Sequence, residues 1–260
     1  MASRFDGKAA IVTGSSSGIG KATALRLARE GAAVCAVANQ NVRGGEATAR
    51  QIADAGGRSL FVKADVAAEA DCRRVAAEAL AAFGRIDVLV NNAGITRAAP
   101  FEKMDEAFWD TVLDTNLKSA YLASRACIGD MLARGSGNVV NVSSVHARAT
   151  VPGHAAYAAS KAGMCGMTRA LALEFGARGL RFNCILPGTI DLGLYPRDGR
   201  PVDRAAWKPR ASDIQVMKRL GSPDEIAAAV AFLASDDASF VNGAVLTADG
   251  GLLAILKDRP

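Results

Sequence analysis

Two side chains suited to proton transfer lie four positions apart in the stretch YAASK at residues 157–161. Residues at this spacing share one face of a helix, so Tyr157 and Lys161 are expected to project side by side. A phenol has an unperturbed pKa of about 10, and a neighbouring ammonium favours its ionised form. Ser144 precedes Tyr157 by 13 residues and offers a hydroxyl. These residue types predict acid/base chemistry, whereas an amphipathic helix with two ordinary polar residues would show the same spacing.

A glycine-rich turn, TGSSSGIG at residues 13–20, follows an apolar run and opens a helix-like segment. Backbone N–H groups and the helix dipole at such a position favour phosphate binding. Gly14, Gly18 and Gly20 are spaced G-x-x-x-G-x-G, which departs from the usual G-x-G-x-x-G fingerprint. The alternative is a turn that only connects strand and helix. The position of the glycine-rich turn directly after the first predicted strand favours a dinucleotide-binding site instead.

Short apolar runs alternate with segments of helical period along the chain. The predicted strands are residues 9–13, 32–38, 59–63, 86–90, 138–143, 180–186 and 243–248, and the predicted helices are 18–30, 44–55, 68–83, 106–133, 155–176 and 223–234. This alternation, with nearly continuous apolar strands, predicts an α/β protein with a parallel sheet covered by helices on both faces. Since no linker or repeat divides the chain, residues 1–260 are expected to form one domain.

Composition and charge disfavour several other classes of protein. Half of the 260 residues are hydrophobic, which is enough for a sizeable core. The 31 Lys and Arg are interspersed with 26 Asp and Glu, so the net charge of +5 does not indicate a nucleic-acid partner. No apolar run approaches 18 residues, and no signal segment is recognisable, which disfavours membrane spanning and secretion. The five cysteines lack a C-x-x-C pair and are expected to be reduced thiols in a cytoplasmic protein.

The motifs TGSSSGIG, NNAG at 91–94, Asn116, Ser144 and YAASK, in this order and spacing, resemble the short-chain dehydrogenase/reductase family in its compact, single-domain form. The resemblance runs from about residue 5 to residue 251. It implies a Rossmann-like, doubly wound sheet of seven parallel strands. It also implies an NAD(P)-dependent oxidoreductase that transfers a hydride between the nicotinamide and a carbonyl or secondary alcohol.

The family's catalytic tetrad maps onto Asn116, Ser144, Tyr157 and Lys161. By this resemblance, Tyr157 exchanges the proton with the substrate oxygen, and Ser144 stabilises the charge that develops there. Lys161 favours the phenolate and holds the ribose hydroxyls. Asn116 would position a water that connects Lys161 to solvent; taken alone, it would be interpreted as a residue hydrogen-bonded within its helix.

The cofactor contacts also follow from the resemblance, position by position. Asp65 and Val66 are similar to residues that contact the adenine, and PGTI at 187–190 would turn around the carboxamide. Residues 92–94 would line the adenine-ribose side, although they also suit a plain strand-end turn. Leu192 stands where the family commonly has a threonine, and Thr189 is a partial substitute. The expected cofactor residues are Gly14, Ser15, Ser17, Gly18, Ile19, Gly20, Asn39, Asp65, Val66, Asn92, Ala93, Gly94, Tyr157, Lys161, Pro187, Gly188 and Ile190.

The end of the second predicted strand bears on the choice of cofactor. NAD-using relatives carry an acid there, which binds the ribose hydroxyls and would repel a 2′-phosphate. Here that place is held by Ala38, followed by Asn39 and Gln40. We therefore predict NADP(H), with NAD(H) as the alternative, although Arg43 is the only basic residue nearby. The resemblance also implies a homotetramer packed through the helices that contain Asn116 and Tyr157.

The expected substrate pocket contains Ser144, His146 and Tyr157. His146 lies two residues after Ser144 and is otherwise an ordinary surface histidine; His154 is expected to begin the helix of Tyr157, and Met164 and Cys165 to pack. No metal site is predicted. The aperiodic residues from 188 to about 215 are interpreted as a substrate lid. Its basic residues either recognise an anionic substrate or form a solvated surface: Arg197, Arg200, Arg204, Lys208 and Arg210.

The sequence argues against two other functions, of which the first is kept as the alternative. A catalytically silent, dinucleotide-binding regulator of the same fold would be expected to lack Tyr157 or Lys161. The extended epimerase/dehydratase branch expects a longer chain and a G-x-x-G-x-x-G turn.

Overall fold

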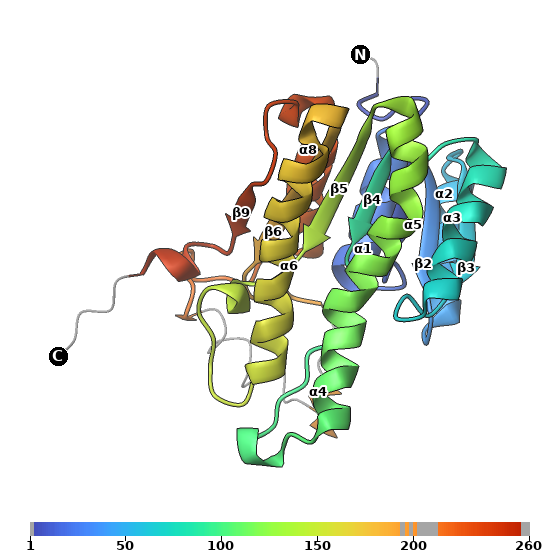
Figure 1. Ribbon diagram of the computed structural model, residues 1–260. Coiled ribbons are helices and arrows are strands. Elements are labelled where there is room, and N and C mark those ends of the chain that lie inside the picture. The colour runs from blue at the N-terminus through green and yellow to red at the C-terminus, as the bar shows by residue number, and fades with distance from the viewer. Residues whose placement is uncertain (1–2, 193–195, 198–199, 202–212, 256–260) are drawn as a thin grey trace.

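One parallel sheet organises the molecule. The computed structural model describes residues 3–192, 196–197, 200–201 and 213–255. Its main sheet has seven strands in the order β3-β2-β1-β4-β5-β6-β9 (Figure 1). The chain moves outward from β1 to β3 and then returns to the other side of β1 through β4, so the direction reverses between β1 and β4. Ligands of such sheets bind outside the carboxyl ends of the strands at this reversal. The predicted doubly wound, seven-stranded α/β fold is confirmed.

The elements agree closely with the predicted ones. The strands are β1 Ala9–Thr13, β2 Ala33–Ala38, β3 Ser59–Lys63, β4 Val88–Asn91, β5 Gly137–Val142, β6 Leu180–Pro187 and β9 Val245–Ala248. The helices are α1 Gly18–Arg29, α2 Val42–Asp54, α3 Glu69–Phe83, α4 Glu106–Leu113, α5 Ser119–Arg134, α6 Ala155–Phe175 and α8 Pro223–Ala234. A two-residue ladder pairs β7 Pro196–Arg197 with β8 Arg200–Pro201. Apart from the π turn within one helix, predicted and observed ends differ by at most two residues.

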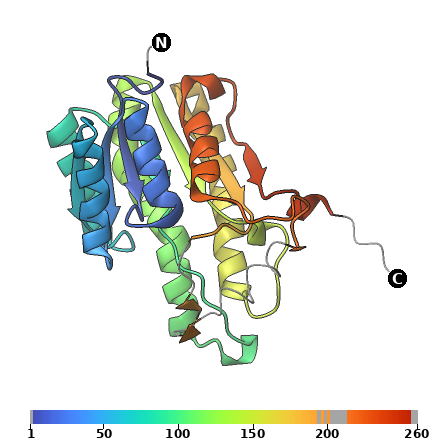
Figure 2. The same cartoon turned by 180° about the vertical axis from the view of Figure 1, so that it is seen from behind.

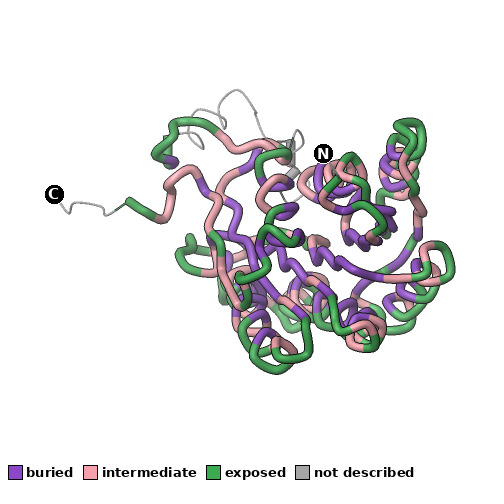
Figure 3. Tube along the Cα trace, turned by 90° about the horizontal axis from the view of Figure 1, so that it is seen from above, coloured by how far each residue is buried: buried purple, intermediate pink, exposed green. Residues whose placement is uncertain are grey.

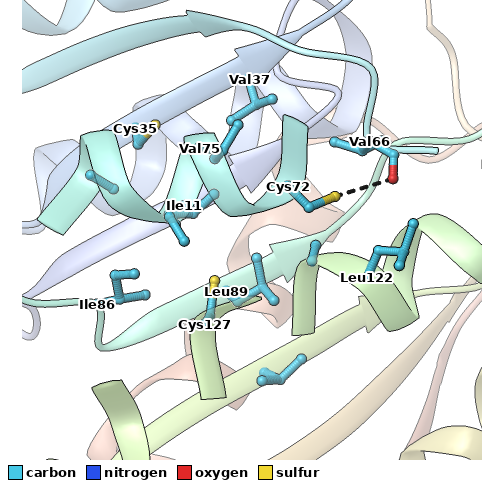
Figure 4. Close-up of a cluster of buried hydrophobic side chains, with 14 of the residues drawn as sticks. Ile11, Cys35, Val37, Val66, Cys72, Val75, Ile86, Leu89, Leu122 and Cys127 are labelled. Atoms are coloured by element: carbon cyan, nitrogen blue, oxygen red, sulfur yellow. Dashed lines mark hydrogen bonds between the residues drawn. The ribbon is translucent and has the colours of Figure 1, made fainter. Parts of the chain in front are cut away.

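Helices cover both faces of the sheet. Figure 2 shows α1 and α8 against one face, and α3, α5 and α6 lie on the other (Figure 1). Because side chains alternate along a strand, Ile11 of β1 packs with Leu89 and Val75 on the α3 side (Figure 4). Its neighbour Val12 packs with Leu27 on the α1 side. Buried residues therefore follow the strands through the centre of the molecule, and exposed ones gather on the outer turns (Figure 3).

The five cysteines are all free and buried. Burial raises the pKa of the Cys35 thiol to about 12, so this thiol stays protonated at neutral pH. Cys72 Sγ donates to the Val66 carbonyl at 3.2 Å (Figure 4). Within the described segments, no helix combines the length and apolarity needed to cross a bilayer.

The segment predicted as one helix over 106–133 is interrupted. Between α4 and α5, residues Asp114–Lys118 form a π turn, in which the Ser119 N–H donates to the Asp114 carbonyl. The segment is helical from Glu106 to Arg134 as predicted, but the π turn inside it was not predicted, because an apolar period does not reveal one extra residue in a single turn. Asn116 lies inside this π turn and is fully buried. Such turns are frequent at functional sites.

The buried Asp87 forms several polar contacts at the end of the sheet where the strands begin. Asp87 accepts the Ala9 N–H at 2.8 Å and pairs with Arg85 at 2.6 Å and Arg134 at 3.0 Å. Burial alone would raise the pKa of Asp87. The hydrogen bonds from Arg85 and the Ala9 N–H, with the positive charges of Arg85 and Arg134, outweigh burial and hold this pKa below its usual value. The carboxylate therefore stabilises the folded state above about pH 4, and this stabilisation is lost as pH falls through the lowered pKa.

Replacing the Asp87 carboxylate by an amide tests how much this carboxylate contributes to the stability of the fold. Asp87→Asn is expected to lower the free energy of unfolding by about 2 kcal/mol at pH 7, since it removes charge-assisted hydrogen bonds to two arginines. The difference from the parent should shrink as the pH approaches 3. Urea denaturation at several pH values measures it. The exposed Asp6→Asn is the matched control, and a deficit that is independent of pH would contradict the assignment.

Candidate active site

A cleft of about 500 Å³ opens at the carboxyl ends of the central strands. Its walls come from the glycine-rich turn, the ends of β4 and β5, the first turns of α6 and the residues after β6. A larger hollow of about 640 Å³ lies where the strands begin and is lined by residues such as Lys8, Ala33 and Arg58. None of the predicted catalytic residues lines that hollow. The cleft at the carboxyl ends is therefore the candidate site.

Ser144, Tyr157 and Lys161 all line the cleft. Ser144 follows β5, and its Oγ accepts the N–H of His146 at 3.2 Å. Tyr157 is half-buried in the first turn of α6. Lys161 is 4% exposed; its Nζ donates to the Val142 carbonyl at 3.0 Å and lies 5.8 Å from the centre of the Tyr157 ring. The helical spacing thus places phenol and ammonium together, and Ser144 lines the same cleft.

Asn116 lies behind this group and is held by three hydrogen bonds. Its Oδ1 accepts the Ile95 N–H at 2.7 Å, and its Nδ2 donates to the Ile95 carbonyl and to Ser160 Oγ, each at 3.0 Å. A Cβ placed on Gly94 would lie 3.0 Å from Asn116 Oδ1 and 3.4 Å from Lys161 Nζ. Asn116 therefore joins α6 to the strand-end loop, beside the lysine. Ser160 was missed at the sequence level, because nothing in its spacing distinguishes it from other small helix residues.

Glycines allow the turn after β1 to pack tightly against the end of β4. Gly14 has φ +66°, and a Cβ there would lie 2.9 Å from the Ala93 Cα. A Cβ on Gly20 would lie 2.2 Å from the Gly14 carbonyl oxygen. Asn92 Nδ2 donates to the carbonyls of Thr13 and Gly14 at 3.0 and 3.2 Å. Thr13 Oγ1, another residue missed by sequence reasoning, accepts the N–H groups of Asn92 and Ala93 at 3.0 Å.

The start of α1 fits a phosphate group. Ser16, Ser17, Gly18 and Ile19 line the cleft, and the N-cap Ser17 makes no side-chain capping bond to the first turn. No acid occupies this first turn. The unsatisfied N–H groups and the positive end of the helix dipole therefore remain available to an anion. Leu192, at the position where the family commonly has threonine, is partly exposed, and its side chain would lie 3.1 Å from a Cβ on Gly18.

Several predicted cofactor residues lie away from the cleft wall. Ser15 is fully buried, and its Oγ donates to the Val37 carbonyl of β2, so Ser16 rather than Ser15 lines the cleft. Asn39 is exposed after β2, and Val66 is buried after β3. Asp65 is exposed, and its Oδ1 accepts the Ala67 N–H at 3.0 Å. Because β1, β2 and β3 are adjacent and parallel, these residues lie along the strand-end edge that continues from the glycine turn.

The residues after β6 close the other end of the cleft. Pro187, Gly188, Thr189 and Ile190 all line it. The buried Gln215, at the end of the segment interpreted as a lid, accepts the Thr189 N–H at 3.2 Å and so holds this turn in place. The lid residues Tyr195, Asp198, Asp203, Arg204, Trp207, Lys208 and Arg210, and the side chains of Arg197 and Arg200, lie outside the described residues.

Both histidines line the cleft, although only His146 was predicted to contact substrate. His154 is the N-cap residue of α6, as expected, but it is also 7% exposed and faces the site. Its place three residues before Tyr157 is the signal that could have indicated this, since such residues are neighbours at a helix start. Met164 and Cys165 are buried, with Met164 Sδ 3.8 Å from Lys161 Nζ. In the described part of the chain, no group of His, Cys, Asp and Glu side chains is arranged to hold a metal ion.

Known proteins are similar to nearly the whole chain. A family profile described as enoyl-(acyl carrier protein) reductase matches residues 14–253. The chain is 42% identical to the cis-4-hydroxycyclohexanecarboxylate dehydrogenase of Sinomonas cyclohexanicum, over 98% of this chain and 100% of that one. The chain belongs to the short-chain dehydrogenase/reductase family.

Other short-chain dehydrogenases/reductases are nearly as similar. The D-threitol dehydrogenase of Mycolicibacterium smegmatis is 42% identical, with 95% of this chain and 94% of that one covered. A structure described as a short-chain alcohol dehydrogenase from Sinorhizobium meliloti superposes with a TM-score of 0.90 at 35% identity, covering 96% of this chain and 98% of the other. The chain is therefore a nicotinamide-dependent oxidoreductase acting on a carbonyl and alcohol pair. A catalytically silent regulator finds no support in these similarities.

Proposed function

We propose that this enzyme interconverts a secondary alcohol and its carbonyl compound, with Tyr157 as acid/base, in a cytoplasmic homotetramer that prefers NADP(H). The observation that carries the proposal is the convergence of Ser144, Tyr157 and Lys161 on the cleft beside the uncapped start of α1. The five buried, free cysteines support a reducing compartment. A screen of alcohols, sugars and 3-oxoacyl compounds with both cofactors, followed by nicotinamide absorbance, tests the activity; no turnover with any class would oppose it.

The chain's own groups account for the proton transfer. When bound, the nicotinamide supplies or takes up the hydride. Tyr157 gives its phenolic proton to the substrate oxygen in reduction and receives it in oxidation. Since Ser144 Oγ already accepts the N–H of His146, its own hydrogen is left to donate to the same substrate oxygen. Lys161 is anchored on the Val142 carbonyl, which keeps its ammonium beside the phenol ring.

Asn116 supports Tyr157 and Lys161 by holding their helix in place. Its three hydrogen bonds hold α6 against the loop after β4, and its Oδ1 and Lys161 Nζ lie on the same side of Gly94. We assign to Asn116 the role of positioning a water molecule that connects Lys161 to solvent. His146 and Ser144 are assigned to the substrate pocket, and the segment from 188 to about 215 is assigned as the substrate lid of a single domain.

The preference for NADP(H) is supported by the surroundings of the glycine turn. A Cβ on Gly44 of α2 would lie 2.6 Å from the Ser16 carbonyl oxygen, so α2 begins next to the turn. No acid lies in the first turn of α2, and Arg43 is exposed there. A 2′-phosphate at this point would meet a cation and no carboxylate.

We expect kcat/KM to be higher with NADP(H) than with NAD(H). Arg43→Ala should lower kcat/KM for NADP(H) by roughly tenfold, as loss of one charged contact of about 1.4 kcal/mol implies, and leave NAD(H) unaffected. Arg50→Ala, an exposed arginine further along α2, is the matched control. Steady-state kinetics with each cofactor compare the parent, Arg43→Ala and Arg50→Ala. A parent that works better with NAD(H) would overturn the preference.

The tetramer is supported by apolar side chains left uncovered on the monomer. Leu173 of α6 is 87% exposed, and Phe240, after α8, is fully exposed. Light scattering at micromolar concentration is expected to give a mass four times that of the chain. Leu173→Asp should shift the protein to smaller species because it places a charge on this apolar surface, whereas Gln51→Asp on α2 should not. A stable monomeric parent would contradict the proposal.

A further inference from the structure

Two cysteine thiols are in contact between the active-site helix α6 and strand β6, which pack against each other (Figure 1). Cys165 of α6 and Cys184 of β6 are both buried, and their sulfur atoms lie 3.8 Å apart. No other pair among the five cysteines, all of which lie within the described residues, has its sulfur atoms in contact. The reaction assigned to the tetrad uses neither thiol.

The pair lies in a small apolar cluster at the edge of the sheet. Leu186 completes the buried part of this cluster, and the partly buried Ala147 and Val245 pack against it. Val245 belongs to β9, which is the edge strand, so the cluster is separate from the two large cores on the faces of the sheet. Cys165 is 7% exposed, whereas Cys184 is fully buried. Cys165 is therefore the member of the pair that keeps contact with solvent.

The surroundings of Cys165 favour its thiolate. A hydrogen bond from the Cys184 thiol lowers the pKa of Cys165 against the opposing effect of burial, and the positive charges of Arg169 and Arg148 lower it further. Burial instead raises the pKa of the three cysteines outside this pair. Because the thiolate is the form that reacts with peroxides, Cys165 is the cysteine of this chain best suited to oxidation.

We propose that Cys165 and Cys184 form an oxidation site, at which hydrogen peroxide closes a disulfide between α6 and β6 and reversibly lowers turnover. The Cys165 sulfur attacks one peroxide oxygen, the O–O bond breaks, and a sulfenic acid forms while the other oxygen leaves as water with the Cys165 proton. The Cys184 sulfur then attacks the Cys165 sulfur, the S–O bond breaks, and a second water leaves with the Cys184 proton. The two thiols lose two electrons and two protons, which reduce the peroxide to two waters.

The disulfide would act on the helix turn that carries the catalytic lysine. Cys165 follows Lys161 by one turn, and its Sγ lies 3.6 Å from the Lys161 carbonyl oxygen, which also accepts the Ser143 hydroxyl at 2.7 Å. The two sulfurs must approach from 3.8 Å to about 2.05 Å, which turns Cys165 away from this carbonyl and draws α6 towards β6. The effect on turnover rests on the proposed function of Lys161, whereas formation of the disulfide does not.

Peptide mapping tests the disulfide without any substrate. The full chain is reduced, freed of reductant, treated with a small excess of hydrogen peroxide, and alkylated in denaturant before digestion with trypsin. We expect a disulfide within one chain that joins peptides 162–169 and 182–197, with three of the five thiols alkylated and the cross-link lost after dithiothreitol. Oxidised cysteine without a cross-link, a disulfide between other cysteines, or one between two chains would overturn the site.

Variants connect the disulfide to turnover. Peroxide should lower the kcat of the parent at least about tenfold, as a small displacement of a catalytic group implies, and dithiothreitol should restore it. Cys165→Ala and Cys184→Ala should each keep the basal kcat and lose both the cross-link and the inhibition, so that either variant suffices if the other fails to fold. Cys127→Ala, at a buried cysteine of α5, is the matched control and should be inhibited like the parent.

The outcomes separate this inference from the proposed function. A protein that forms the mapped disulfide but turns over neither alcohols nor carbonyl compounds would support the oxidation site and count against the proposed reaction. An active enzyme whose kcat is unchanged by the mapped disulfide would overturn the effect on turnover. Peroxide inhibition that persists in both alanine variants would overturn that effect too.

Discussion

Replacing Tyr157 by phenylalanine is expected to lower kcat by at least about 100-fold while the affinity for the cofactor is nearly unchanged. In the proposed mechanism the phenolic oxygen exchanges a proton with the substrate, and positioned acids and bases contribute about 10²- to 10⁴-fold. The glycine-rich turn, which is proposed to bind the cofactor phosphates, lies on a different element, at the start of α1. The ring itself, which packs against His146 and His154, is retained by the substitution.

Steady-state kinetics and fluorescence titration of the cofactor measure the two halves of this prediction. Tyr121→Phe, at an exposed tyrosine of α5, is the matched control and should keep both properties. A Tyr157→Phe enzyme with more than a tenth of the parent kcat would refute the acid/base assignment. Loss of cofactor affinity together with kcat would instead indicate that the substitution has disturbed the fold of the cleft.

The second large effect is expected at Gly20. A methyl group there would lie 2.2 Å from the Gly14 carbonyl oxygen and 2.4 Å from Asn92 Nδ2, which are held in place by the hydrogen bond between them. Because the nearer atom is backbone, Gly20→Ala must displace the turn itself. We expect a loss of about 1–3 kcal/mol in the free energy of unfolding, typical of overpacking, and at least a tenfold weaker cofactor complex.

Gly129→Ala is the matched control for Gly20. It also lies inside a helix, α5, but among the described residues no atom beyond its chain neighbours and the helix's own backbone lies within 4 Å of the added methyl group. This substitution should raise the free energy of unfolding by about 0.5–1 kcal/mol, because alanine loses less backbone entropy than glycine in a helix. Urea denaturation and cofactor titration compare the two variants. Parent-like cofactor affinity in Gly20→Ala would show that the turn does not need this close packing.

Local patterns were sufficient to predict the order of the elements. Residues 9–13 and 59–63 form strands as predicted, because a short apolar run that ends at a glycine turn or at an acid is a local property of the chain. The pairing of Tyr157 with Lys161 was also local, since it depends only on the helical repeat. The π turn around Asn116 was not, because one added residue per turn leaves the apolar spacing of a long helix almost unchanged.

The sequence by itself determined the chemistry of the site: the types of the catalytic side chains, the glycine turn after the first strand and the alternation that produces a doubly wound sheet. The tertiary structure alone decided which neighbours these side chains meet. Asn116 bonds to Ile95 and Ser160, 21 and 44 positions away, and Ser15 turns toward β2 instead of the cleft. His154 comes to lie beside His146. Such contacts depend on how separate strands and helices pack against one another, and no periodicity within a single segment records that packing.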